Sequence, residues 1–150
     1  MKKLLVLSLV LGVASLAAAG LSISVDGTPY ADGAVVNAPA GGTIGVYNDA
    51  AFTGATNAVW LEVAPGTEVA GSGAVNAALL PGDWSISDYG LYSGLYYWYI
   101  NNDTPAVGDT LVGDLFTAAV NGPTAVNLYD GNFAYITGIT LIPEPATMAL

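Results

Sequence analysis

Short apolar runs alternate with turn-forming residues from Leu21 onward. Gly, Pro, Asn and Asp recur roughly every ten residues between stretches rich in Val, Ile, Thr and Tyr, the spacing expected of a β-sandwich or barrel. Beyond the N-terminal segment, no stretch shows the three- and four-residue apolar spacing of an amphipathic helix. The pattern predicts an all-β fold, an antiparallel β-sandwich of the jelly-roll kind. Strands are expected at residues 21–25, 28–31, 34–38, 43–49, 57–64, 74–80, 83–87, 94–101, 109–120, 124–130 and 133–142.

Local patterns refine three of these strands. Asp26-Gly27 lies between two alternating runs and predicts a tight hairpin, because both central positions of a type I′ turn need positive φ. In the strand at 57–64, Trp60 and Glu62 share a mixed face, and the opposite face is apolar and predicted to be buried. A bulge is expected near Gly113, and the Ala-rich stretch before residue 80 is compatible with a short helical turn instead of a strand.

The N-terminal segment has a different pattern. Two lysines precede an apolar run that ends near residue 16, and Ala17 and Ala19 form the small-x-small pattern that a signal peptidase cleaves. The run is shorter than the ~20 residues of a bilayer-spanning helix. We therefore predict a signal-peptide helix over residues 1–19, cleavage after Ala19, and one exported domain over residues 20–142.

Cleavage there would remove every basic residue, because Lys2 and Lys3 are the only two in the sequence. The mature chain would carry 12 acidic side chains and no cationic one. Its carboxylates repel one another, and nucleic acid or an anionic membrane surface has the wrong sign of charge to bind it. Divalent cations and neutral polymers remain compatible with this charge.

Histidine and cysteine are absent. The mature chain would therefore lack the side chains that Ser-His-Asp or Cys-His catalysis, P-loop phosphate binding and imidazole or thiolate zinc sites require. Paired carboxylates can hydrolyse glycosides, but the acidic residues here lie singly in predicted turns. The sequence predicts a protein that is not an enzyme.

No cofactor is expected apart from calcium, which prefers oxygen ligands. The densest groups of such ligands are Asn101-Asn102-Asp103 and Asp130-Gly131-Asn132, with Asp103 and Asp130 as candidate calcium ligands. Neither stretch has the spacing of an EF-hand loop. The favoured interpretation is that these side chains cap their own turns.

The densest aromatic stretch, DYGLYSGLYYWYINND, begins at Asp88. Strand alternation sends Tyr92, Tyr96, Trp98 and Ile100 to one face and Leu91, Leu95, Tyr97 and Tyr99 to the other. One face must be core. The other is either the half-wet outer side of a central strand or a surface that contacts sugar rings or another protein. The candidate glycan- or protein-contact residues are Tyr92, Tyr96, Trp98, Asn101 and Asn102.

The segment 108–128, with GGTIGVYND upstream, resembles the cohesin-like β-sandwich of secreted bacterial surface proteins, and the chain is also similar to carbohydrate-binding modules of that architecture. In the cohesin-like family a G-D-x-L…L-F stretch leads through a Gly turn into a V-x-L strand. The matching residues are Gly108, Asp109, Leu111, Leu115, Phe116, Gly122, Val126 and Leu128. The resemblance implies a fold and transfers no binding site.

Pro143, Glu144 and Pro145 follow the last predicted strand and cannot extend the sheet, because proline lacks an N–H donor. The residues after them, ATMAL, are typical of the first turn of a hydrophobic helix. This arrangement resembles the PEP-CTERM sorting signal of exported bacterial proteins, which an exosortase recognises. The resemblance implies a sorting segment over 143–150, an exosortase partner, and a membrane-spanning helix with terminal arginines that continues beyond the given chain.

Together these observations predict an exported, non-catalytic component of the bacterial cell envelope or extracellular matrix that makes structural or adhesive contacts. A carbohydrate-binding module that uses residues 89–103 is the first alternative. A calcium-dependent surface assembly module is the second. An extracellular polysaccharide or surface protein is the expected partner, and nucleic acid is disfavoured by charge.

Overall fold

The structure is a computed structural model that describes residues 20–38, 42–49, 58–79, 84–102 and 112–143. The predicted signal-peptide helix and the predicted start of a C-terminal helix lie outside these ranges. Within them, no helix is long and apolar enough to cross a membrane.

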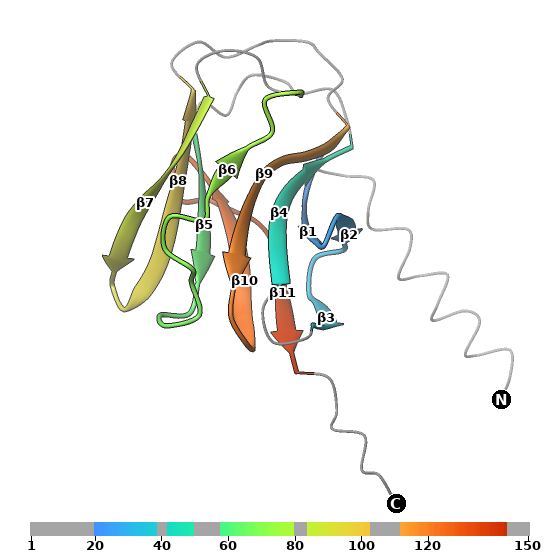
Figure 1. Cartoon of the computed structure of the whole chain (residues 1–150), viewed down its shortest axis with the longest axis vertical. Coiled ribbons are helices and arrows are strands. Elements are labelled where there is room, and N and C mark those ends of the chain that lie inside the picture. Colours follow the sequence, from blue (N-terminus) through green and yellow to red (C-terminus); the bar gives the residue numbers. More distant parts are fainter. Residues whose placement is uncertain (1–19, 39–41, 50–57, 80–83, 103–111, 144–150) are drawn as a thin grey trace, which may run out of the picture.

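The described residues form eleven strands in two packed sheets, which confirms the prediction of an all-β sandwich (Figure 1). Sheet A has the order β2-β1-β4-β9-β6, and sheet B has the order β3-β11-β10-β5-β8-β7. The strands are β1 (Leu21–Val25), β2 (Thr28–Tyr30), β3 (Ala34–Asn37), β4 (Gly42–Asn48), β5 (Ala58–Val63), β6 (Ala74–Val75), β7 (Trp84–Tyr92), β8 (Leu95–Asn102), β9 (Gly113–Val120), β10 (Thr124–Asp130) and β11 (Tyr135–Ile142).

The hairpin between β1 and β2 turns where the sequence predicts. Asp26 has a φ of 48° and Gly27 a φ of 83°, the positive values that a two-residue hairpin turn needs. The two strands pair antiparallel, with Val25 opposite Thr28. The Asp26 carboxylate also accepts a hydrogen bond from the backbone N–H of Thr43 at 3.0 Å, which ties the turn to the start of β4.

The core lies between the two sheets and follows the two-residue alternation of the strands. In β5, Val59, Leu61 and Val63 are buried against it, as predicted, and Trp60 and Glu62 point to the opposite side of sheet B. The largest fully buried side chains are Trp98, Phe116, Ile23, Ile44, Leu61, Ile100, Leu115, Leu128, Leu141, Val46 and Val63.

A bulge interrupts the pairing of β4 with β9 close to the predicted position. Val46 pairs with Phe116 and Tyr47 pairs with Asp114, so Leu115 is the extra residue. The bulge places two consecutive side chains, Leu115 and Phe116, in the core. Strict alternation would have exposed one of them.

Three features differ from the predicted layout. Although the sandwich is otherwise paired antiparallel in its described strands, β3 runs parallel to β11, with Val36 opposite Leu141. Strand β7 continues to Tyr92, well past the predicted end at residue 87, because its pairing with β8 runs through to the Ser93-Gly94 turn. In the Ala-rich stretch, the chain forms only the two-residue strand β6 and then a turn over residues 77–79.

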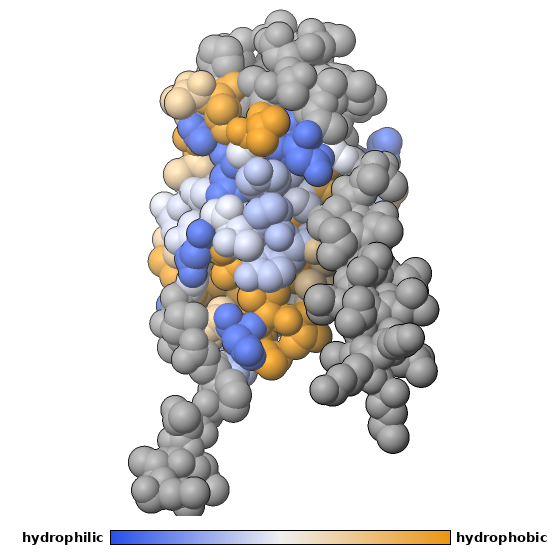
Figure 2. Space-filling model, turned by 90° about the vertical axis from the view of Figure 1, so that its right-hand side faces the viewer, coloured by the Kyte–Doolittle hydropathy of each residue, from blue (hydrophilic) through white to orange (hydrophobic). Residues whose placement is uncertain are grey.

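Figure 2 shows the face that lies to the right in Figure 1. In its visible part, polar side chains separate the hydrophobic groups that lie near the two ends of the sandwich. The hydrophobic side chains seen there do not merge into one surface.

Candidate functional site

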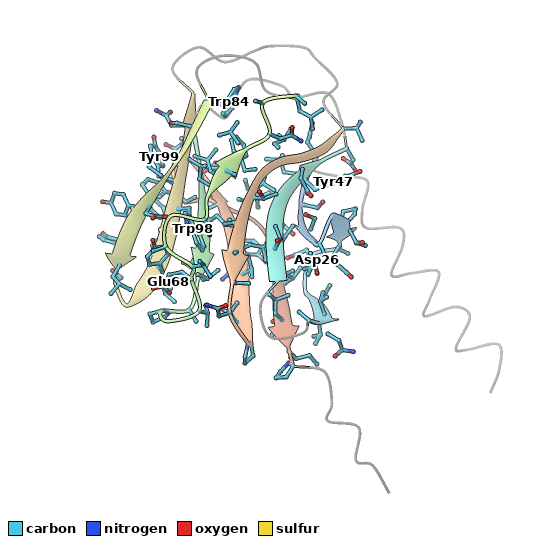
Figure 3. The ribbon with its side chains drawn as sticks, in the orientation of Figure 1. Asp26, Tyr47, Glu68, Trp84, Trp98 and Tyr99 are labelled. Carbon is cyan, nitrogen blue, oxygen red and sulfur yellow. The ribbon has the colours of Figure 1, made fainter. Side chains whose placement is uncertain are left out.

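The solvent-facing side of sheet B carries a continuous group of aromatic rings, which we call the aromatic patch. It draws on four strands, β5, β7, β8 and β10, on the turn between β10 and β11, and on the start of β11. Its members are Trp60, Tyr89, Tyr92, Tyr97, Tyr99, Tyr129, Phe133 and Tyr135. Figure 3 labels Tyr99 on β8, whereas the preceding residue, Trp98, lies between the two sheets.

Strand alternation places most of these rings on one side. Leu61 and Trp98 pair across β5 and β8 and both face the core, so their neighbours Trp60 and Tyr99, which also pair, face outward. A register shift in β7 between Asp88 and Gly90 leaves Tyr89 beside the ladder. The bulge turns this ring toward Trp60.

Trp60 is the centre of the patch. Its indole stacks on the ring of Phe133, with centroids 4.8 Å apart and planes 20° apart, and contacts Tyr99 at 4.3 Å. Tyr89 meets it edge-on at 5.0 Å and Tyr97 edge-on at 6.4 Å. Offset stacked and edge-to-face arrangements of this kind stabilise aromatic clusters beyond the area they bury, by about 0.5–1.5 kcal/mol per pair.

Phe133 reaches Trp60 from a strained backbone conformation. Its φ is 62°, in the left-handed region that large side chains avoid. The Asp130 carboxylate holds this turn by accepting hydrogen bonds from the backbone N–H groups of Asn132 and Ala134, both at 2.8 Å. The strained turn thus presents a phenyl ring that is still 46% exposed.

Glu62 lies beneath the rings, 5% exposed, with neutral donors around it. Its carboxylate accepts hydrogen bonds from the Tyr97 hydroxyl, from Nδ2 of Asn127 at 2.8 Å and from the Tyr129 hydroxyl at 3.2 Å. The charge is therefore held by hydrogen bonds from neutral groups and not by an ion pair, since the sequence contains no basic residue after Lys3.

A second carboxylate is tied to the edge of the patch. Oδ1 of Asp32 accepts hydrogen bonds from the Tyr135 hydroxyl at 2.5 Å and from the backbone N–H of Gly138 at 2.9 Å. Gly138 makes room for this contact, because a Cβ there would lie 2.8 Å from the Tyr135 hydroxyl and 2.3 Å from Oδ1 of Asn127. Because residue 138 has no side chain, the Tyr135 side chain can pass over this position and reach Asp32.

Burial and these carboxylates act together on the tyrosine hydroxyls. Burial, and then the hydrogen bond to Glu62, raise the pKa of Tyr97, and burial and the charge of Glu62 raise the pKa of Tyr129. Burial and the hydrogen bond to Asp32 raise the pKa of Tyr135 to about 12. The three hydroxyls are therefore protonated donors at neutral pH.

The structure corrects two of the predicted contact residues. Tyr96 and Trp98 were expected to line an exposed surface, but they are 6% and 0% exposed and belong to the core between the sheets. Within β8 the alternation was predicted correctly, but the choice of the buried face was wrong, and Tyr92 was assigned to the side of Tyr96 instead of that of Tyr97. Tyr92 does belong to the patch, because the two-residue turn after it places it opposite Leu95 and on the same side as Tyr97.

The other predicted site residues have mixed positions. Asn101 lies on β8 opposite Ala58 and Ser85 and is partly exposed, whereas the side chain of Asn102 lies outside the described part. Pro143 directly follows β11 and is exposed. Four further predicted residues are outside the described ranges, namely Ala17, Ala19, Glu144 and Pro145.

Trp60 and Phe133 are patch residues that the sequence analysis does not select. A signal for Trp60 exists, because it shares with Glu62 the mixed face of a strand whose other face is apolar. Phe133 gives no such signal, since its role depends on a turn that folds over a strand distant in sequence.

The candidate calcium ligands do not converge in the described part of the chain. Asp130 uses its carboxylate to cap its own turn, the interpretation that the sequence favours, and Asp103 lies outside the described residues. Across the described ranges, no group of three or more acidic side chains is placed to hold a metal ion.

No protein-family model matches this chain, and no curated protein matches it. Among solved structures, similar folds include the sixth cohesin of scaffoldin B from Acetivibrio cellulolyticus, in complex with a dockerin, at 12% identity, with 83% of this chain and 99% of that chain covered and a TM-score of 0.47.

Two further cohesins also match. A non-cellulosomal cohesin from Archaeoglobus fulgidus has 9% identity, 82% and 93% coverage of this chain and that chain, and a TM-score of 0.37. A cohesin module of a family 33 glycoside hydrolase from Clostridium perfringens has 8% identity, 85% and 100% coverage and a TM-score of 0.35. At these values the likeness carries no function over to this chain.

Proposed function

We propose that this chain is an exported, non-catalytic surface module that holds on to another macromolecule through the aromatic patch. The observation that carries the proposal is the exposure of the patch: Tyr89, Tyr92 and Tyr135 are 53–56% exposed and Phe133 is 46% exposed, all on one side of sheet B. Tyrosine and other aromatic residues gathered in this way are typical anchors of binding interfaces.

The strained backbone at Phe133 supports a contact role. A large residue in the left-handed region costs about 1–2 kcal/mol, and glycine or asparagine would avoid that cost. Stacking on Trp60 offsets part of this strain energy, but the Phe133 side chain remains 46% exposed to water. Strain that serves to display an apolar ring is expected where a partner covers that ring.

The hydrogen bonds of the patch favour binding over catalysis. Glu62, Asp32 and Asp130 all act as acceptors that hold side chains or turns in place. Histidine and cysteine are absent from the sequence, and lysine occurs only at positions 2 and 3, so nucleophile activation that depends on histidine, cysteine or lysine has no residues to use there. The groups present can position aromatic surfaces and hydrogen-bond a partner.

Phe133→Asn should reduce binding without unfolding the protein. Asparagine tolerates the left-handed conformation, so relief of about 1–2 kcal/mol of strain offsets the loss of about 0.5–1.5 kcal/mol of stacking on Trp60. We expect retention of the purified protein on envelopes of the producing bacterium to fall roughly tenfold, the effect of an interface anchor. Co-sedimentation at graded protein concentrations measures it.

Thr140→Asn is the matched control, because Thr140 is an exposed residue of β11 outside the patch. Its retention should equal that of the unmodified protein. Equal retention of Phe133→Asn and the unmodified protein, with unchanged melting, would show that the patch is not the contact surface.

A glycan partner is the second candidate, and the Phe133 ring favours it. One face of this ring lies on Trp60 and the side chain remains 46% exposed, which leaves apolar ring surface on which a sugar ring can stack. If the partner is a glycan, Phe133→Asn should be retained less than Thr140→Asn on a panel of purified polysaccharides. Polysaccharide free of protein should then be sufficient for retention.

Sorting through the C-terminal tripeptide is a further part of the proposal. Pro143 directly follows β11 and is exposed. The tripeptide Pro143-Glu144-Pro145 and the apolar residues after it resemble an exosortase signal. Replacing Pro143, Glu144 and Pro145 by alanine in the full natural gene should keep the protein unprocessed in an exosortase-bearing bacterium. Intact-mass measurement and fractionation test this, with Pro65→Ala as control, and normal processing of the triple variant would refute it.

A further inference from the structure

We propose that the aromatic patch receives a lysine- or arginine-rich segment of a partner protein, whose cationic side chains lie on the rings. The inference rests on the proposed function, since it names the chemistry of the partner at the same surface. Cations are attracted to the faces of Trp, Tyr and Phe rings within about 6 Å of the ring centroid.

The charge of the chain is the first argument. After Lys3, the sequence has 12 acidic side chains and no lysine, arginine or histidine. Three of the acids have their carboxylates at this face or at its edge: Asp32, Glu62 and Asp130. With no internal cation to neutralise them, the field at this face is negative and attracts a basic partner.

The hydrogen bonds beneath the rings are the second argument. Tyr97 and Tyr129 donate their hydroxyl protons to Glu62, and Tyr135 donates to Asp32. A phenol that donates a hydrogen bond to a carboxylate has a higher electron density in its ring, because the negative acceptor polarises the O–H bond and shifts electrons toward the ring. Tyr97 is 6% exposed, so the rings of this group that a cation can reach are those of Tyr129 and Tyr135, and both are thereby made more attractive to it than isolated tyrosines are.

Burial of Glu62 strengthens this effect. The carboxylate is 5% exposed and lies under the rings, where water and salt screen its charge less than at the open surface. A guanidinium or ammonium group on the patch therefore interacts with ring faces and with a nearby negative charge together. Arginine gains further, because its planar group stacks on aromatic faces.

The same charge argues against two other occupants. A second copy of this chain would bring its own acidic surface against the patch, and like charges across an interface oppose association. A neutral glycan can stack on the rings but gains nothing from the surrounding carboxylates. A basic segment interacts favourably with both the aromatic rings and the negative charge around them.

The test compares a lysine-rich peptide with the same peptide acetylated on its lysine Nε atoms. Acetylation keeps the length and backbone and removes the charge. By calorimetric titration of the full chain, we expect the unmodified peptide to bind roughly two- to thirty-fold more tightly than the acetylated one. Raising the salt concentration should reduce that difference, because added ions screen the exposed part of the interaction.

Two isocharged variants locate the effect. Glu62→Gln removes the charge beneath the rings and keeps an amide oxygen as acceptor, and it should weaken binding of the lysine-rich peptide by roughly two- to five-fold. Asp49→Asn makes the same change in net charge at an exposed position that follows β4 of sheet A, and it should leave binding unchanged. Melting curves establish that both variants are folded.

The outcomes separate this inference from the proposed function. Equal binding of the lysine-rich and acetylated peptides overturns the cationic partner. If retention on envelopes still depends on Phe133 in that case, the patch remains a contact surface for an uncharged partner such as a glycan. Loss of peptide binding in Asp49→Asn as large as in Glu62→Gln shows a diffuse charge effect and also overturns the inference. Should Glu62→Gln fail to fold, the comparison of the two peptides on the unmodified protein decides the question.

Discussion

Trp98→Ala is expected to destabilise the protein by about 3–5 kcal/mol, the usual range for removing a large aromatic side chain from a packed core. The Trp98 side chain is fully buried between the sheets, and its ring contacts Tyr96 edge-on at 5.0 Å. The smaller residue would leave a cavity that the surrounding strands cannot close, because they are fixed by ladder hydrogen bonds on both sides of β8. Loss of that much is a large share of the stability of a domain of this size.

Denaturant unfolding of Trp98→Ala and Tyr99→Ala measures the difference. Tyr99 is the next residue and faces outward against Trp60, so its loss removes a ring contact and less burial. We expect the cost at Tyr99 to be below half of that at Trp98. A smaller cost for Trp98→Ala than for Tyr99→Ala would mean that the two faces of β8 are assigned the wrong way round.

Stability is expected to fall steeply in alkali as the pH rises from about 10 to 12. Burial, with the charge of Asp88 next in importance, raises the pKa of Tyr96 from 10.0 to about 12, and burial with Asp32 raises that of Tyr135 equally. The pKa values of Tyr97 and Tyr129 rise for the same kind of reason, through burial and Glu62.

The direction in which stability changes with pH follows from the number of protons that the folded and unfolded states bind. Above pH 10 the unfolded tyrosines lose their protons while the folded ones keep them, so unfolding releases protons and becomes more favourable as the pH increases. Each tyrosine contributes at most about 1.4 kcal/mol per pH unit. Tyr135 contributes less, because it is 53% exposed and solvent screens its interaction with Asp32. Below pH 10 this contribution to stability is fully present.

Unfolding free energies measured at intervals between pH 8 and 12 check this prediction, since the ordinary tyrosine pKa of about 10 falls within that range. Tyr135→Phe removes one of the four hydroxyls whose pKa is raised and should make the decline shallower. Thr140→Val changes an exposed residue of the same strand without a phenol and should leave the slope unaltered. A flat profile across this range would contradict the coupling between the tyrosines and their carboxylates.

The positions of the strands could be predicted from the sequence because turn chemistry is local. Asp26-Gly27 fixes the first hairpin through positive φ at two adjacent residues, and the alternation in β5 correctly separates Leu61 from Trp60. The parallel pairing of β3 with β11 could not be predicted in the same way. Those two strands are far apart in sequence, and nothing in either one specifies its distant neighbour.

The site was harder to predict than the fold. In β8 both faces are aromatic, so alternation correctly groups Tyr96 with Trp98 and Tyr97 with Tyr99, but it cannot show which group meets the opposite sheet. That choice depends on β5, whose apolar face pairs Leu61 with Trp98. The placement of Phe133 on Trp60 depends on a third segment and became visible only in three dimensions.

The register shift in β7 affects how neighbouring molecules of this protein can associate. This strand is one of the two edge strands of sheet B, and a long unpaired edge invites strands of neighbouring molecules to add to it. The irregularity between Asp88 and Gly90 breaks the straight row of donors and acceptors, and Asp88 itself accepts a hydrogen bond from the backbone N–H of Gly71 at 2.6 Å. Many copies held close together would therefore resist adding to one another through this edge, which keeps neighbouring molecules separate there.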